Sequence, residues 1–188
     1  MTKFIEPYNS NWKIEFEKIN QVIKAQLNGL EIDIQHVGST AISGLIAKPI
    51  LDIDIIIDNK NLLDDITLRL EKIGYISKGE QGIAGRFAFR QTSDDTPSAS
   101  PKQKWQPHHL YVCFADSLAL KNHLLFRDAL RKDTNLVEKY GQLKISLTDN
   151  FKITSENYTT MKTEFIISVL ATMEFEKEEL SKIISANA

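Results

Sequence analysis

The stretch that decides the fold begins in a small-residue loop, His36-Val37-Gly38-Ser39-Thr40, and runs through Lys48-Pro49 into Ile50-Leu51-Asp52-Ile53-Asp54-Ile55-Ile56-Ile57. Its second half is almost wholly apolar and rich in isoleucine, which predicts a strand in the middle of a sheet. Because strand side chains alternate between two faces, Asp52 and Asp54 point to the same side, ~6–7 Å apart along the strand. Two carboxylates therefore converge on one spot, where a cationic partner is expected.

Paired carboxylates of this kind suit Mg²⁺ or Mn²⁺, because these ions prefer oxygen ligands and clamp the reacting oxygens of a phosphoryl or nucleotidyl transfer. The turn at Gly38-Ser39 fits the same chemistry. Glycine lets the backbone approach a phosphate closely, and the N-terminus of a following short helix favours anions. The pattern predicts an active site in which Asp52 and Asp54 are both metal ligands and catalytic residues. The spacing alone fits equally well a partly exposed strand end whose acids pair with lysine or arginine.

The same residues carry a family resemblance. Gly-Ser, followed after about a dozen residues by Asp-apolar-Asp, resembles the signature of the nucleotidyltransferase superfamily. The longer string HVGSTAISGLIAKPILDIDI resembles the GrpB family within that superfamily, and the similarity continues through 82–90, 108–112 and 123–131. It implies an α+β fold in one domain over 1–188: a nucleotidyltransferase-like mixed β-sheet flanked by helices, with a helical C-terminal portion from about 117 to 180.

The resemblance also implies a function. A nucleoside triphosphate is expected to bind with Mg²⁺ or Mn²⁺ at Asp52 and Asp54, and its nucleotidyl group to pass to an unknown small-molecule or protein acceptor. Enzymes of the superfamily usually bring a third carboxylate from a neighbouring strand, yet the positions available here are His109 and Tyr111. A histidine ligand favours Mn²⁺ or Zn²⁺. A catalytically degenerate nucleotide- or phosphate-binding module of the same fold therefore stays open beside the enzyme.

Basic residues near the acids are candidate phosphate ligands. Arg86 and Arg90 leave one face of a predicted strand, and their guanidinium forks match phosphate oxygens, although both are also compatible with solvated strand positions. Lys48 pairs either with phosphate or with an acid. The predicted nucleotide- or phosphate-binding residues are Gly38, Ser39, Lys48, Arg86, Arg90 and His109.

Other polar positions receive a structural interpretation. His36 is predicted to be a hydrogen-bonded structural residue rather than a base. His123, Arg127 and Arg131 share one face of a predicted helix, which we interpret as solvated, with a cleft lining as the alternative. The polar segment 92–107 is predicted to be a mobile loop over the mouth of the site, or else an insertion without function.

Hydrophobic periodicity and turn residues predict the elements. Helices are expected over 9–27, 61–73, 117–131 and 135–147 and from Ser155, and strands over 31–37, 50–57, 75–77, 86–90 and 109–114. The segment 174–188 is expected to fray.

Composition limits the function further. The chain of 188 residues is 42% hydrophobic and 26% charged, as in ordinary globular domains. A net charge of −2 gives no basic face for duplex nucleic acid. The single cysteine, Cys113, fits a reducing compartment and a buried position. The sequence offers no membrane-spanning run, so a cytoplasmic protein without membrane partners is predicted, and its oligomeric state is left open.

Overall fold

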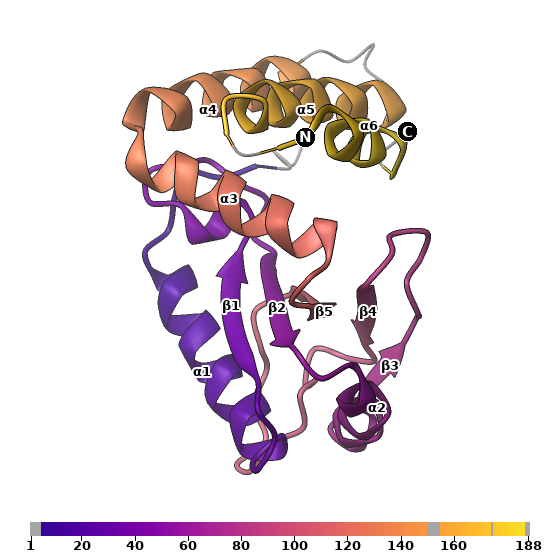
Figure 1. Cartoon of the computed structure of the whole chain (residues 1–188). Helices are drawn as coiled ribbons and strands as arrows, with labels where there is room; N and C mark the ends of the chain where they lie inside the picture. The colour runs from indigo at the N-terminus through magenta and orange to yellow at the C-terminus, as the bar shows by residue number, and fades with distance from the viewer. Residues whose placement is uncertain (1–4, 150–154, 174, 187–188) are drawn as a thin grey trace.

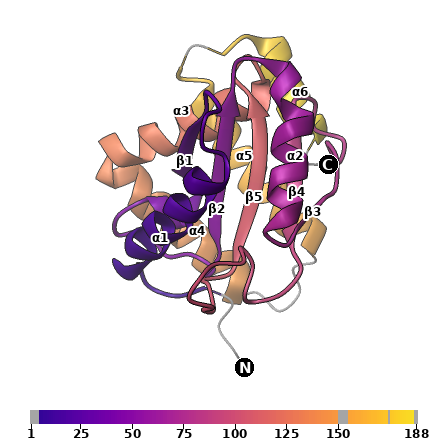
Figure 2. The same cartoon turned by 90° about the horizontal axis from the view of Figure 1, so that it is seen from below.

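A mixed sheet separates two layers of helices in the computed structural model, which describes residues 5–149, 155–173 and 175–186. The strands are β1 (Asp33–Val37), β2 (Leu51–Ile57), β3 (Tyr75–Ser77), β4 (Arg86–Gln91) and β5 (His108–Phe114). The helices are α1 (Asn11–Gln26), α2 (Leu63–Lys72), α3 (Leu118–Lys132), α4 (Thr134–Asp149), α5 (Ser155–Leu170) and α6 (Lys177–Ala186), with 3₁₀ turns η1 (Ser39–Ala41) and η2 (Lys60–Leu62). Helices α1 and α2 cover one face of the sheet, and α3–α6 lie on the other (Figure 1 and Figure 2).

The five-stranded sheet has the order β1-β2-β5-β4-β3. Strand β2 pairs antiparallel with β1 and parallel with β5, and the remaining pairs are antiparallel. The isoleucine-rich strand is therefore interior, flanked on both sides by partners. The predicted α+β fold with a mixed sheet is confirmed.

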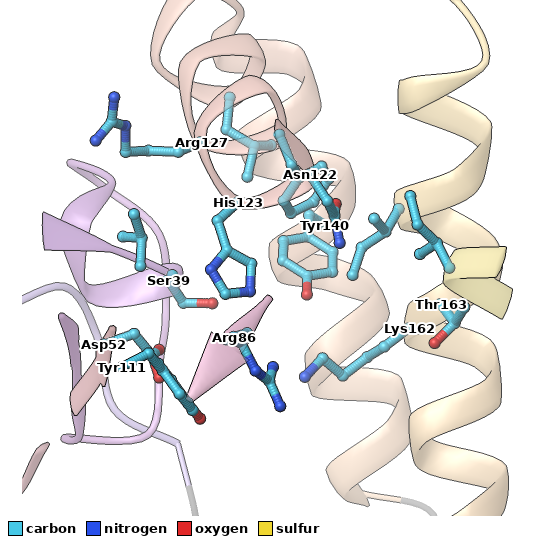
Figure 3. A pocket seen from close by; sticks show the side chains of 16 residues that line it. Ser39, Asp52, Arg86, Tyr111, Asn122, His123, Arg127, Tyr140, Lys162 and Thr163 are labelled. Atoms are coloured by element: carbon cyan, nitrogen blue, oxygen red, sulfur yellow. The ribbon is translucent and has the colours of Figure 1, made fainter. Parts of the chain in front are cut away.

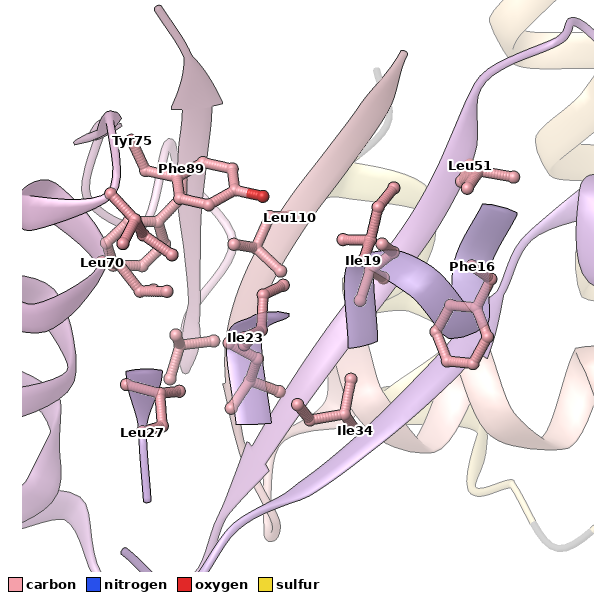
Figure 4. Close-up of a cluster of buried hydrophobic side chains, with 14 of the residues drawn as sticks. Phe16, Ile19, Ile23, Leu27, Ile34, Leu51, Leu70, Tyr75, Phe89 and Leu110 are labelled. Carbon is pink, nitrogen blue, oxygen red and sulfur yellow. The ribbon is translucent and has the colours of Figure 1, made fainter. Parts of the chain in front are cut away.

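The main hydrophobic core fills the space between the sheet and helices α1 and α2 (Figure 4). From β2 it takes every second residue, Leu51, Ile53, Ile55 and Ile57, each at most 1% exposed. The spacing of the buried α1 residues is close to 3.6, so one stripe of that helix faces the sheet. The apolar residues of this stripe are Trp12, Phe16, Ile19 and Ile23, and Asn20 is buried beside them. The alternation that fills this core sends the other β2 residues to the opposite face.

The connection 92–107 is not a lid over the site. It packs on the core side of the sheet, where Trp105 is 5% exposed and joins the main cluster. The Trp105 indole donates to the Pro97 carbonyl at 2.7 Å, and the Ser98 amide donates to the Ile73 carbonyl at 2.7 Å. The prediction of a mobile cover was wrong, because one large apolar side chain anchors this polar segment to the core.

The helical layer packs around its own smaller cluster, in which Leu130 of α3 and Tyr140 of α4 meet Ile42 and Leu45 from the connection to β2. The tail predicted to fray contains α6 instead, which contacts α3 and α5. No helix in the described ranges is long and apolar enough to cross a membrane.

Candidate functional site

The face of the sheet opposite the main core carries both predicted carboxylates. Across the parallel β2–β5 pair, Asp52 lies level with His109 and Asp54 lies level with Tyr111. Residues level with one another in a sheet point to the same side. The strand alternation that buries isoleucines on one face therefore builds a polar row on the other.

Asp54 is fully buried and pairs with a histidine from the helical layer. Its Oδ2 lies 2.7 Å from Nδ1 of His123 on α3, whose side chain is 23% exposed. Burial acts to lower the pKa of His123, but the charge and hydrogen bond of Asp54 outweigh it, so this pKa is raised above its ordinary value. The second oxygen, Oδ1, is buried without a hydrogen-bond partner in the described part of the chain.

Asp52 forms a second carboxylate–histidine pair nearer to solvent. Its Oδ1 lies 3.0 Å from Nδ1 of His109, and the two side chains are 33% and 56% exposed. The hydrogen bond to Asp52 raises the pKa of His109, against the opposing effects of burial and of nearby Lys48 and Arg86. Each carboxylate therefore has a histidine as its partner, at the place where the sequence predicted a cationic group.

The Gly38-Ser39 turn packs directly on Asp52. Gly38 has a φ of 67°, and a Cβ built on it would lie 2.1 Å from Asp52 Oδ2. Only glycine fits here, both for its backbone conformation and for the space it leaves. The turn then opens the 3₁₀ helix η1 at Ser39. The first carboxylate and the predicted phosphate loop are thus in contact.

A buried lysine holds the serine of this turn. Lys144 of α4 is 3% exposed, and its Nζ donates to Ser39 Oγ at 2.6 Å and to the Ile46 carbonyl at 2.9 Å. Its ammonium also lies 4.5 Å from the centre of the Tyr140 ring. Burial, reinforced by the charge of Lys162, lowers the pKa of Lys144 to about 7.

Further cations come from the sheet and from α5. The Arg86 guanidinium lies over the Tyr111 ring at 4.6 Å, and its Nε is buried without a hydrogen-bond partner among the described residues. Lys162 extends from α5 into the cavity (Figure 3). Burial lowers the pKa of Lys162, although Asp52 acts to raise it. Three basic side chains, Arg86, Lys144 and Lys162, therefore lie around the Ser39 turn, where a bound anion would favour the charged form of the two lysines.

A cavity of about 220 Å³ lies between the sheet and the helical layer (Figure 3). Asp54, His109 and Lys144 lie beside it, each bonded to or paired with a residue of its lining. Its polar lining includes Ser39, Asp52, Arg86, Tyr111, Asn122, His123, Arg127, Lys162 and Thr163. Its apolar lining includes Val37, Phe126, Leu130, Ile166 and Ile183.

The predicted site residues divide into three groups. Those that line the cavity are Gly38, Ser39, Asp52 and Arg86. Asp54 and His109 lie beside it, each in a carboxylate–histidine pair. Lys48 and Arg90 are exposed and do not line it, although Lys48 is close enough to lower the pKa of His109.

The helix face that we interpreted as solvated is a wall of the site, so the alternative prediction of a cleft lining holds for His123 and Arg127. His123 pairs with Asp54, and Arg127 is 8% exposed and donates to Gln35 Oε1 at 2.8 Å. Only Arg131, whose side chain is 45% exposed, lies toward solvent. His36 is on the opposite face of the sheet, stacked on Phe16 and level with Ile53. Burial lowers the pKa of His36 to about 4, in keeping with a structural residue.

Sequence reasoning missed Lys144 altogether. A signal for it exists: Tyr140, Lys144 and Leu147 follow the i, i+4, i+7 spacing of one helix face, and all three are buried. A lysine on a stripe of this kind needs a partner inside the protein, because a buried ammonium is costly.

The donor set fits a divalent cation only in part. Two carboxylates are adjacent, and Oδ1 of Asp54 is buried without a partner, as an oxygen awaiting a ligand would be. Among the described residues, however, no three histidine, cysteine or acidic side chains form a group able to hold a metal ion. Mg²⁺ is commonly held by one or two carboxylates together with substrate phosphates. The site therefore suits a cation that enters with a polyphosphate better than a resident metal.

Comparisons with known proteins agree with this architecture. UPF0157 protein YqkA of Bacillus subtilis is 31% identical over 159 residues, which are 85% of this chain and 43% of that protein. Glutamate-rich protein GrpB of Alkalihalophilus pseudofirmus is 28% identical over 167 residues, covering 88% of this chain and 92% of the relative. The present chain thus spans less than half of YqkA but nearly all of the second relative.

Solved structures give the same picture. The crystal structure of conserved protein GrpB from Enterococcus faecalis matches with a TM-score of 0.71 and 30% identity, over 95% of this chain and 98% of that one. The Cid1 poly(U) polymerase with MgGTP bound matches with a TM-score of 0.56 and 19% identity, over 87% of this chain and 51% of that one. At this identity the second likeness shows the fold alone, a nucleotidyltransferase-like one. The family model for the GrpB protein matches residues 3–172, and the chain therefore belongs to the GrpB family.

Proposed function

We propose that this protein binds a nucleoside triphosphate together with Mg²⁺ or Mn²⁺ and transfers its nucleotidyl group to a small-molecule or protein acceptor. The observation that carries the proposal is the packing of Asp52 on Gly38. A Cβ at Gly38 would lie 2.1 Å from Asp52 Oδ2, so the loop suited to phosphate and the first carboxylate meet at one point. Such a junction serves a ligand that brings both phosphate and a cation.

The polyphosphate subsite is assigned to the groups around Ser39. The Ser39 hydroxyl, the ammoniums of Lys144 and Lys162 and the guanidinium of Arg86 all lie at or beside the cavity. Burial lowers the pKa of Lys144 and that of Lys162, and the charge of Lys162 lowers the pKa of Lys144 further. A bound polyanion would favour the charged form of both lysines.

Asp52 and Asp54 are assigned to the cation that accompanies the triphosphate. Such an ion would neutralise charge on the transferring phosphoryl group and orient the attacking oxygen. Oδ1 of Asp54 offers a buried ligand atom while Oδ2 stays with His123. In this reading His123 and His109 orient the two carboxylates.

A second candidate function is a nucleotide- or phosphate-binding module without transfer activity. It is favoured by the histidine partners of both carboxylates and by the absence of a third metal-ligating group within the described ranges. In that case the cationic cavity holds a phosphorylated ligand, and the carboxylates balance the charge of the histidines.

Thermal melts with Mn²⁺ and each nucleoside triphosphate test the proposal on the wild type, Asp54→Asn and the control Asp58→Asn. Asp58 continues the same strand parity but is exposed beyond the end of β2. In the wild type, nucleotide at about one hundred times its Kd is expected to raise the Tm by roughly 5–10 °C when Mn²⁺ is present. Asp54→Asn should lose the part of this rise that depends on Mn²⁺, and Asp58→Asn should keep it.

Each candidate has its own outcome. Asp54→Asn also removes the charged partner of His123, so its Tm without ligand should fall, and every rise is measured within one variant. Metal-dependent release of pyrophosphate by the wild type, reduced by orders of magnitude in Asp54→Asn, is required of an enzyme. A nucleotide-induced rise that needs no metal, without pyrophosphate release, identifies the binding module. No rise in any variant rejects both functions.

A further inference from the structure

The C-terminal helix α6 forms part of the cavity wall. Ile183 lines the cavity and is 5% exposed, whereas the next residue, Ile184, is 49% exposed. The stretch matched by the family model ends at residue 172, before α6 begins at Lys177. This helix therefore adds one buried apolar side chain to a site that the rest of the chain builds.

Specific contacts hold α6 against the helical layer. Lys121 of α3 donates to both carboxylate oxygens of Glu179 at 2.8 Å, and its ammonium lies 4.4 Å from the centre of the Phe175 ring. Glu179 Oε2 also accepts from the Glu176 amide at 2.9 Å, at the start of the helix. One lysine thus fixes the entry and the first turn of α6, and with them the position of Ile183.

The apolar side chains of the cavity come mainly from its helical wall. The sheet side contributes Ser39, Asp52, Arg86 and Tyr111 (Figure 3). The helical side contributes the apolar residues Phe126, Leu130, Ile166 and Ile183. It also carries polar and charged side chains, which are Asn122, His123, Arg127, Tyr140, Lys162 and Thr163. A ligand that satisfies both walls carries a polyanion at one end and a flat, largely apolar group with hydrogen-bonding edges at the other.

We propose that the apolar part of the helical wall, formed by Phe126, Leu130, Ile166 and Ile183, is the subsite for the nucleotide base and that Ile183 of α6 sets the size of base it admits. The inference rests on the proposed function, because the polyphosphate subsite fixes the other end of the same ligand. It assigns α6 a role in selecting the ligand, in addition to its packing on α3. Binding energy from the base would then be separable from binding energy of the phosphates.

The test compares Ile183→Phe with the matched control Ile184→Phe, using nucleoside triphosphates and inorganic tripolyphosphate as probes. A phenylalanine at 183 fills the apolar wall, so nucleotide affinity should fall by about tenfold or more, while tripolyphosphate affinity stays within about twofold. Ile184→Phe should change neither affinity, because residue 184 is exposed. Titration calorimetry measures both probes on each protein.

A second variant, Ile183→Ala, is needed because Ile183→Phe could weaken binding simply by displacing α6. Ile183→Ala removes apolar contact and enlarges the wall, so pyrimidine nucleotides should bind about three- to tenfold more weakly, and preference should move toward purines. A structural role alone would not change the ratio between bases. Glu179→Gln, which breaks the ion pair with Lys121, should weaken nucleotide and spare tripolyphosphate, and Glu178→Gln, whose carboxylate pairs with Lys182 on the surface, should change neither.

The outcomes separate this inference from the proposed function. If the wild type binds neither probe, the proposed function fails and the base subsite fails with it. If the wild type binds nucleotide and Ile183→Phe leaves that affinity unchanged, or weakens both probes equally, the base subsite is rejected and the phosphate site stands. Loss of nucleotide affinity alone, with an altered base ratio in Ile183→Ala, supports it.

Discussion

Lys144 is a lysine in a buried position, although lysine side chains are normally exposed to solvent. It is 3% exposed, and burial lowers its pKa from 10.5 to about 7. In the unfolded chain the ammonium stays charged up to about pH 10.5, so between the two values the unfolded state binds more protons than the folded state. Stability contributed through this group therefore rises with pH between about 7 and 10.5.

This prediction is tested with Lys144→Met against Lys139→Met, which changes an exposed lysine of the same helix. From pH 7 to pH 10 the free energy of unfolding of the wild type should gain on the order of 3 kcal/mol relative to Lys144→Met. Urea unfolding at intervals of one pH unit measures it. Tyr75 and Cys113, whose pKa values are raised by burial, oppose the trend equally in every variant and so cancel. Parallel pH curves for the wild type and Lys144→Met would contradict the assignment.

The residues of the site differ in how far the sequence could identify them. Asp52 and Asp54 follow from alternation on one strand, which is a local property. His123 lies 69 positions from Asp54, and its helix spacing identifies a face without saying what that face meets. Ser39 and Lys144 are 105 positions apart, so their contact depends on how α4 docks. Whether such distant residues meet depends on how the helices dock on the sheet, which a local sequence pattern does not show.

At the level of elements, the connection 92–107 behaves as part of the core. We expect Trp105→Ala to lower the free energy of unfolding by about 3–5 kcal/mol, because a large buried side chain leaves a cavity that collapses only partly. Nucleotide affinity at a temperature where the variant is folded should remain that of the wild type, since Trp105 is on the far side of the sheet from the cavity.

Chemical denaturation and calorimetry on the same samples measure both quantities. Lys104→Ala is the matched control: its side chain is 80% exposed and should leave both unchanged. If folded Trp105→Ala bound nucleotide more weakly than the wild type, the connection 92–107 would contribute to the binding site after all.

Elements with strong periodicity were predictable and the exceptions have a physical cause. Strand β2 and helix α1 carry their burial pattern in consecutive residues, so their types and approximate bounds follow from the sequence. The polar connection gave no such signal, because its packing depends on the single large apolar residue Trp105 and on hydrogen bonds such as that from the Ser98 amide to the Ile73 carbonyl. The sequence did not show that α6 is held in place. The ion pair that holds it, between Lys121 and Glu179, joins residues 58 positions apart and leaves no local pattern.

For the molecule as a whole, a ligand in the cavity touches both the sheet and the helical layer. Saturating nucleotide with Mn²⁺ should therefore slow amide hydrogen exchange in η1 and β2 and, in the same experiment, in α4 and α5, by stabilising the contact between the layers. Helix α2 lies on the opposite face of the sheet and serves as the internal control, because sub-global opening there does not require the cavity to open. Protection confined to the sheet would mean that the helical layer takes no part in binding.

The pairing of β2 with β5 also bears on where this chain tolerates changes in length. The residues that meet are 57 positions apart, Asp52 with His109 and Asp54 with Tyr111. A shift of β5 by one residue against β2, as an insertion at the start of β5 would cause, would send His109 and Tyr111 into the α1–α2 core and Leu110 and Val112 toward the carboxylates. The core and the site would be disrupted together, because both depend on the alternation of β5 side chains between the two faces of the sheet. Insertions and deletions can then accumulate in the connections between strands, while the two paired strands must vary by substitution alone.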